Sequence, residues 1–347
     1  MRSACAAVLA LLVACADDGV AAEAETSSST TAGSSSGAMS TGSSEATTGS
    51  SGEDETSADT GETTTDPSTT GTETCAPAPD AQAPWVRPYV DDIVARLSGA
   101  AELSPGITVP ERSTATHRAA TADWLEAEFE TLGLDVQRHA YAPQGTNIVG
   151  RLPATQPGGR TYVVGAHFDS VPGSPGANDN ATGVAYVLSL ARYLASVECR
   201  SHDMLFVGFD QEEIGLVGSE AYAAHLVDEG EDVISVHTID QMGWDADGDR
   251  AIELERADEG LYEVYEAANA TLPSPLTLHE TGTGFTDHVS FRPYGFEAVG
   301  LTEEFVNGDT TPHYHLASDT YDTVNMDLLV STCVLGHTAF AMLIDAG

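Results

Sequence analysis

The apolar run at residues 161–166 constrains the fold more than any other stretch of this chain. It consists largely of β-forming residues and is almost continuously apolar, which is typical of a strand buried on both faces. A loop rich in Gly and Pro follows at 171–178, and apolar residues then recur at helical spacing over 182–194. A buried strand, a loop and a helix in this order predict one unit of a largely parallel sheet.

The same alternation covers most of residues 85–239. Helical spacing predicts helices at 85–97, 117–132, 182–194 and 218–227. Strands are predicted, the first two as an edge pair, at 136–141, 147–152, 161–166, 204–210 and 233–239. The sequence therefore predicts an α/β fold with a mostly parallel twisted central sheet, helices on both faces and a ligand site at the carboxyl ends of the strands.

The chain is strongly acidic. Its 347 residues carry a formal net charge of −41 at pH 7, and all 13 cationic side chains are arginines. Such a surface repels phosphate, so nucleic acid is excluded as a partner, and it attracts cations. Acidity also keeps a protein soluble, a role that requires no ligand.

The first 15 residues predict export. One arginine precedes an apolar run that is too short to span a bilayer and has the length of a secretory signal. The run ends in Leu12, Val13, Ala14 and Cys15, which resembles the lipobox of bacterial lipoproteins, whose cysteine becomes acylated. This resemblance implies a membrane-anchored lipoprotein of the cell envelope. The alternative is ordinary signal cleavage, which would give a secreted protein.

The composition changes after the signal. Residues 16–80 are rich in Ser, Thr, Gly and Glu and almost lack large apolar side chains, so they are predicted to form a disordered tether. Residues 81–347 are predicted to form one folded domain. Cys75, Cys199 and Cys333 cannot all pair internally, and an exported protein is expected to join two of them, without the sequence deciding which.

Side chains with metal-binding chemistry follow the ends of the predicted strands. His167 and Asp169 follow one strand, and their spacing lets the carboxylate hold the second nitrogen of a metal-binding imidazole. Glu212 and Glu213 follow another strand, where one carboxylate can bind a metal while the other accepts a proton from water. Asp240 ends a third strand, so these groups are expected to meet at one edge of the sheet.

A second imidazole is available near the C terminus, from His313 or His315, and Asp179 lies just before a predicted helix. If Asp179 bridges two cations, each cation receives one histidine, one further carboxylate and one oxygen of Asp179. This donor set suits two zinc ions per chain with a position left open for water.

Six motifs, in this order, resemble the co-catalytic two-zinc aminopeptidases, metallopeptidase family twenty-eight, over about residues 85–347. They are G-A-H-F-D-S, G-A-N-D-N-A-T-G, D-Q-E-E-I-G-L-x-G-S, I-D-Q-M-G, T-D-H-V-S-F and H-L-A-S-D-T. The resemblance implies a zinc exopeptidase-like fold and a metallo-aminopeptidase that hydrolyses the amino-terminal bond of a peptide substrate.

The resemblance also implies a role for individual residues. The ligands that it implies are His167, Asp179 and Asp240 for one zinc ion and Asp179, Glu213 and His315 for the other. Glu212 is implied as the general base, and a cis peptide bond is implied after Asp179.

Two positions depart from the family pattern. Thr286 stands where the family often has serine, and Thr283 stands where some members have the tyrosine that stabilises the oxyanion. Thr286 keeps its hydroxyl as a substrate contact, and Tyr314 and Tyr321 are the possible replacements for the oxyanion donor.

Two other functions are compatible with the same fold. A glutaminyl cyclase uses one zinc ion, and His167 beside Asp169 favours two metals and hydrolysis instead. A non-catalytic binding ectodomain is expected to have lost ligands, whereas this chain keeps all five and Glu212. His237 and His288 are expected to be structural. The sequence indicates neither the oligomeric state nor the preferred amino-terminal residue.

Overall fold

The computed structural model describes residues 75–306 and 308–344. The predicted signal sequence, most of the predicted tether and Cys15 lie outside these residues. The description begins six residues before the predicted domain boundary at residue 81, and Cys75 is already joined to the domain by a disulfide bond to Cys199. Cys333 is buried and unpaired.

A mixed eight-stranded sheet in the described residues runs in the order β1-β2-β4-β3-β5-β8-β6-β7. The central strands β4, β3, β5 and β8 are parallel, and β1, β2 and β6 are antiparallel to their inner neighbours. The strands are β1 Asp135–Ala142, β2 Gly145–Leu152, β3 Thr161–His167, β4 Asp203–Phe209, β5 Val233–Asp240, β6 Ala251–Glu255, β7 Thr277–Thr281 and β8 Ala298–Glu303.

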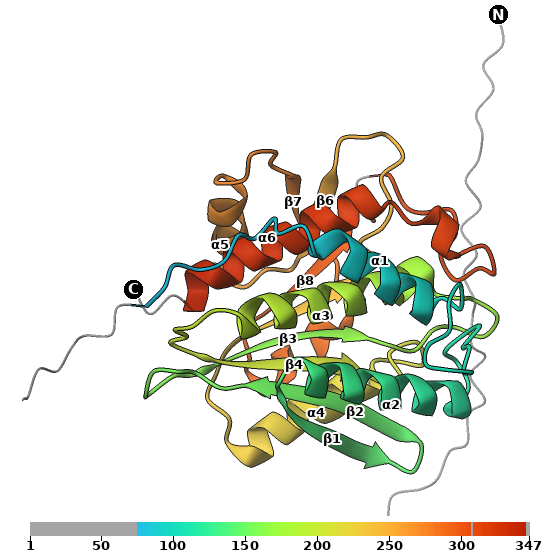
Figure 1. The fold of residues 1–347 in the computed structure, drawn as a ribbon, viewed down its shortest axis with the longest axis horizontal. Coiled ribbons are helices and arrows are strands. Elements are labelled where there is room, and N and C mark those ends of the chain that lie inside the picture. Colours follow the sequence, from blue (N-terminus) through green and yellow to red (C-terminus); the bar gives the residue numbers. More distant parts are fainter. Residues whose placement is uncertain (1–74, 307, 345–347) are drawn as a thin grey trace, which may run out of the picture. The chain divides into compact units, whose positions relative to one another are not determined.

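Helices cover both faces of this sheet (Figure 1). The larger apolar core joins one face to α1 Val86–Leu97, α2 Ala115–Thr131, α3 Thr182–Ala195, α5 Leu261–Asn269 and α6 Met326–Ile344. A smaller core on the opposite face packs α4 Val217–Glu229 against β2, β3, β4 and β5. The predicted layering, with a mostly parallel sheet between helices, is confirmed.

The connections around β3 create the crevice in which ligands bind in such sheets. The chain leaves β3 through α3 to reach β4 on one side, and it then crosses through α4 to β5 on the other side of β3. Because the two crossover helices lie on opposite faces, the loops at the carboxyl ends of the strands diverge there. Every residue of β3 is buried, as its apolar run predicts.

The helices and strands predicted over residues 85–239 are all present, with ends shifted by at most two residues. The elements after Asp240 were not predicted individually. Among them, α6 is the only described helix long and apolar enough to cross a membrane, but 61% of its apolar window is buried inside the protein. It packs against α3 and α5, as the core helix of a globular domain does.

Candidate metal centre

The carboxyl ends of neighbouring parallel strands bring together side chains that are far apart in the sequence. His167 ends β3, Asp240 ends β5, and Glu212 and Glu213 lie in the loop after β4. Asp179 lies in the short segment Ala177–Ala181 that leads into α3, and its own backbone angles are not helical. Its peptide bond to Asn180 is cis, as the resemblance to the family implied.

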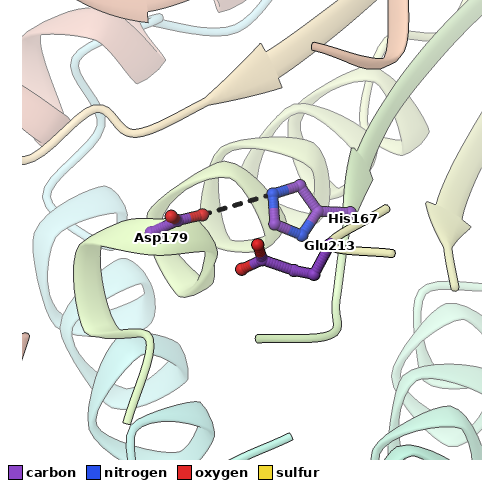
Figure 2. A group of neighbouring side chains, drawn as sticks. All are labelled: His167, Asp179 and Glu213. Atoms are coloured by element: carbon purple, nitrogen blue, oxygen red, sulfur yellow. Dashed lines mark ion pairs between the residues drawn. The ribbon is translucent and has the colours of Figure 1, made fainter. Parts of the chain in front are cut away.

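His167 stands among three carboxylates. Its Nε2 atom lies 3.4 Å from Oδ1 of Asp179, 3.5 Å from Oδ1 of Asp240 and 3.9 Å from Oε2 of Glu212. Figure 2 shows the carboxylates of Asp179 and Glu213 on the side of the His167 ring that faces away from β3. One donor atom from each of His167, Asp179 and Glu213 lies within 4.8 Å of the other two.

His315 completes a second half of the cluster. Its Nε2 atom lies 3.3 Å from Oδ2 of Asp179 and 3.1 Å from Oε2 of Glu213. The two oxygens of Asp179 therefore face two different imidazoles. His313, the other histidine considered from the sequence, lies outside the cluster, because its Nδ1 atom is hydrogen-bonded to Ser318 and its ring packs against Trp244.

Asp169 connects the two halves. One of its oxygens lies 3.4 Å from Nδ1 of His167, on the side of the ring opposite Asp179. The same carboxylate accepts hydrogen bonds from the backbone N–H groups of Glu212 and Glu213. A single buried carboxylate thus fixes the orientation of His167 and the start of the Glu212–Glu213 loop.

The buried groups of the cluster shift one another's pKa values. Burial lowers the pKa of His167, but the charges of Glu212 and Asp240 and the contacts with Asp169 and Asp179 together outweigh it and hold the pKa well above its usual value. Contacts with Asp179 and Glu213 raise the pKa of His315 to about 10. Burial raises the pKa of Glu212 to about 10, against the opposing charge of His167. Bound dications would displace the imidazole protons and lower the pKa of these carboxyl groups.

The donor atoms fit a metal. Nε2 of His167, Oε1 of Glu213 and Oδ1 of Asp240 are buried without a hydrogen-bond partner among the described residues. Buried polar atoms left in this way are costly unless a ligand satisfies them. Imidazole nitrogen with carboxylate oxygen is a donor set that zinc accepts, so the residues present match the two-zinc interpretation of the sequence.

A pocket opens beside the cluster and is lined by both polar and aromatic groups. Phe285, Phe305, Tyr314 and Thr283 contribute to it together with the carboxylates of the cluster. Tyr314 stacks on His315, with ring centroids 3.7 Å apart.

Thr286 lines the same pocket, but its hydroxyl is already engaged. It donates a hydrogen bond to Oε2 of Glu255 and lies 2.8 Å from Nδ1 of His288. His288 is buried there, and His237 is buried between Ser235 and Tyr265, so both have the structural surroundings expected for them.

Several residues that position the cluster were not identified from the sequence. Arg112 is fully buried and donates hydrogen bonds to the carbonyl oxygens of Phe168, Pro175 and Gly176, which fixes the loop between His167 and Asp179. Nothing in the sequence around Arg112 indicates that its side chain holds this distant loop.

Two acidic residues hold the same segment from other elements. Asp319 accepts hydrogen bonds from the backbone N–H groups of Asn178 and Asp179, and Glu303 accepts from the Asn178 side chain. Asp319 belongs to the motif H-L-A-S-D-T, and membership of this motif is the only feature of the sequence that points to a role for Asp319 in the site.

Comparisons with known proteins agree with this geometry. The family model described as Peptidase family M28 matches residues 147–334. Aminopeptidase YwaD of Bacillus subtilis is 31% identical over 176 residues, which are 48% of this chain and 37% of YwaD. The matched part of this chain thus spans little more than a third of that relative's length.

Solved structures share the fold. The zinc aminopeptidase BSAP from Bacillus subtilis has a TM-score of 0.67 at 17% identity, covering 75% of this chain and 95% of its own. A glutaminyl cyclase from Porphyromonas gingivalis has a TM-score of 0.61 at 18% identity, covering 74% of this chain and 98% of its own. At these identities the likeness is one of fold. Because the family model matches more than half of the 347 residues, this chain belongs to peptidase family M28.

Proposed function

We propose that this chain is a two-zinc aminopeptidase that hydrolyses the first bond of peptides with a free amino terminus. The observation that carries the proposal is the position of Asp179, whose two oxygens face His167 at 3.4 Å and His315 at 3.3 Å. A carboxylate in this position is suited to bridge two cations. The aminopeptidase names of the relatives support the same activity.

Each zinc ion would take three side chains. His167, Asp179 and Asp240 would hold one ion, and Asp179, Glu213 and His315 the other. When bound, the ions would polarise the substrate carbonyl and make water a stronger nucleophile at neutral pH. The three ligand carboxylates would not fully neutralise two dications. The remaining positive charge would lower the pKa of the neighbouring Glu212 and favour its ionised form, which can act as a base.

Glu212 would move the proton. It lines the pocket, its side chain is only 13% exposed, and its backbone is held by Asp169. The carboxylate would accept a proton from the attacking water and pass it to the nitrogen of the leaving amine. Because the neighbouring residue, Glu213, is turned toward His315 at 3.1 Å, the two adjacent glutamates have separate tasks.

Of the three hydroxyl groups considered from the sequence, that of Tyr314 is the best candidate for stabilising the oxyanion. The hydroxyl of Tyr321 donates a hydrogen bond to Asp91, and Tyr321 does not line the pocket. The hydroxyl of Tyr314 belongs to a pocket-lining side chain that stacks on His315, and among the described residues it has no hydrogen-bond partner. The hydroxyl of Thr286 is bonded to Glu255 and would act by holding that carboxylate in place.

The amino-terminal requirement gives the decisive experiment. The pocket has several carboxylates and no arginine in its lining, so a charged α-amino group is satisfied there and a blocked one is not. We expect hydrolysis of leucine anilide to exceed that of its acetylated form by about 100-fold or more, and to stop when zinc is chelated. The measurement is release of the anilide with each substrate. Equal cleavage of both would exclude an aminopeptidase while leaving a metallohydrolase.

The same assay tests the alternative of a single-zinc glutaminyl cyclase, which the fold likeness to the Porphyromonas gingivalis enzyme raises. The presence of two complete halves argues against it, because a one-metal centre would leave either His167 with Asp240 or His315 with Glu213 without a cation to bind. Ammonia released from an amino-terminal glutaminyl peptide, without cleavage of leucine anilide, would favour the cyclase. Neither product in zinc-loaded protein would favour a binding ectodomain.

We propose further that Cys15 is acylated and anchors the protein to the cell envelope through the segment 16–80. Two or three acyl chains give stable membrane attachment, whereas a single chain gives little. Native protein is expected in the membrane fraction and the Cys15→Ser variant in the soluble fraction, measured by fractionation and by mass spectrometry of the amino terminus. An unmodified amino terminus in the native protein would end this proposal.

A further inference from the structure

Large apolar side chains are exposed around the opening of the metal centre. Among the described residues nine large apolar side chains are exposed, and five of them line the pocket or directly adjoin, in the chain, a residue of the pocket or the metal centre. These five are Ile214, Phe285, Val306, Tyr314 and Leu316. Exposed apolar side chains scattered singly need no explanation, but a group gathered around one opening marks a binding surface.

Two members of this group, Ile214 and Leu316, directly follow metal ligands in the chain. Ile214 follows Glu213 and Leu316 follows His315, and the side chains of these two ligands approach each other to 3.1 Å. Ile214 is 67% exposed and Leu316 is 52% exposed. Neither of them belongs to the lining of the pocket. They therefore lie beside the metal centre but outside the space that receives the first residue of a substrate.

Hydrogen-bonded turns hold both side chains in these exposed positions. The backbone N–H of Gly215 donates to the carbonyl oxygen of Glu212, which closes a turn that contains Ile214. The N–H of Leu316 donates to the carbonyl oxygen of His313 in the same way. Groups that are fixed before a ligand arrives lose little conformational freedom on binding. The two exposed side chains are thus preorganised for a contact.

The two halves of the metal centre differ in exposure, which indicates where a peptide leaves it. The side chain of His315 is 39% exposed, whereas that of His167 is only 1% exposed. A peptide whose first residue occupies the pocket places its scissile bond at the metal pair, and the rest of the chain then reaches solvent past the exposed His315 half. Ile214 and Leu316 adjoin the two ligands of this half.

We propose that Ile214 and Leu316 form an exit surface that binds the first side chain after the scissile bond. The preferred substrates are then oligopeptides with a large apolar residue at that position. A peptide is the occupant because the exit surface is continuous with the site that holds the scissile bond. This inference rests on the proposed aminopeptidase activity and extends it to the residue that leaves.

The test measures kcat/KM of full-length, zinc-loaded protein for leucyl-leucyl-glycine amide and leucyl-glycyl-glycine amide. The two peptides differ only in the side chain after the first bond. The native protein is expected to prefer the leucyl-leucyl peptide by about 5- to 20-fold, as for partial burial of one leucine side chain. Ile214→Asn and Leu316→Asn should each lower this preference by about twofold or more. Because the preference compares two substrates on one protein, loss of zinc lowers both values and leaves their ratio unchanged.

Ile107→Asn is the matched control. Ile107 is 46% exposed and does not line the pocket, so its replacement should leave the native preference unchanged. The Glu212→Gln variant gives a readout without turnover, since binding of the same two peptides to it can be measured by calorimetry. It should bind the leucyl-leucyl peptide about 5-fold or more tightly, and adding Ile214→Asn should reduce this difference.

Two kinds of failure are distinguishable. Equal kcat/KM for the two peptides in the native protein would overturn the exit surface and leave the aminopeptidase in place, as would a preference that neither Ile214→Asn nor Leu316→Asn lowers. Hydrolysis of neither peptide by the zinc-loaded native protein would contradict the proposed activity itself, and this inference with it.

Discussion

The Glu212→Gln variant should bind zinc normally and turn over substrate about 100- to 10,000-fold more slowly, the usual range for loss of a general base. Glutamine keeps the length and hydrogen-bonding capacity of the side chain but cannot accept the proton of the attacking water. Glu212 approaches His167 only to 3.9 Å, the longest of the three carboxylate distances to that ring, so the metal ligands are left in place. The measurements are zinc by elemental analysis and initial rates with leucine anilide.

The adjacent residue supplies the matched comparison. Glu213→Gln is the same chemical change one residue later, but it removes a carboxylate that lies 3.1 Å from His315 and should therefore reduce zinc content as well as turnover. Glu220→Gln, at an exposed position in α4, controls for the loss of one negative charge. Turnover of Glu212→Gln close to that of the native protein would remove Glu212 from the role of general base.

Changing Asp179 to Ala should empty both catalytic zinc positions and abolish turnover. The expectation follows from the two oxygens of Asp179, one directed at His167 and the other at His315. By contrast, His167→Ala should mainly release one ion, because Glu213 and His315 still hold the other. Zinc content after dialysis is measured for both variants and for the native protein. It distinguishes a residue that binds both ions from a residue that binds only one.

A result in which Asp179→Ala loses one zinc ion, or none, would contradict the bridging role. Added zinc offers a control for folding, because an intact site with weakened affinity should regain metal at higher concentration. Circular dichroism of the variant should match that of the native protein, since the backbone of Asp179 remains held by Asp319.

The part of the centre that lies at strand ends could be predicted from the sequence. His167, Glu212 and Asp240 each follow a buried apolar strand, and parallel strands end at one edge of a sheet, so pattern alone brings them together. This reasoning left the choice between His313 and His315 open, because side chains in a loop do not follow the regular spacing of a helix or strand. The resemblance to the family indicated His315, and in the structure it is His315 that lies beside Asp179.

Other features depend on contacts that no local pattern encodes. The hydrogen bonds of Arg112 join a loop before α2 to the segment after β3, and the partner of Cys75 lies 124 residues further along the chain. The strands β6 and β7 have five residues each. In so short a segment, periodicity reveals neither the strand nor its position in the sheet. Tertiary packing decides such features, and propensity is a weak guide to them.

The bond between Cys75 and Cys199 also determines how the domain would respond to mechanical load. A pull that arrives along the first 74 residues enters at Cys75 and passes through the covalent bridge to Cys199, bypassing the chain between them. The bypassed loop contains β3, His167 and Asp179, so tension on the polypeptide cannot extend this part of the metal centre while the bridge is intact. Tension between the amino-terminal segment and a point after Cys199 would instead act first on the segments that lie outside the loop.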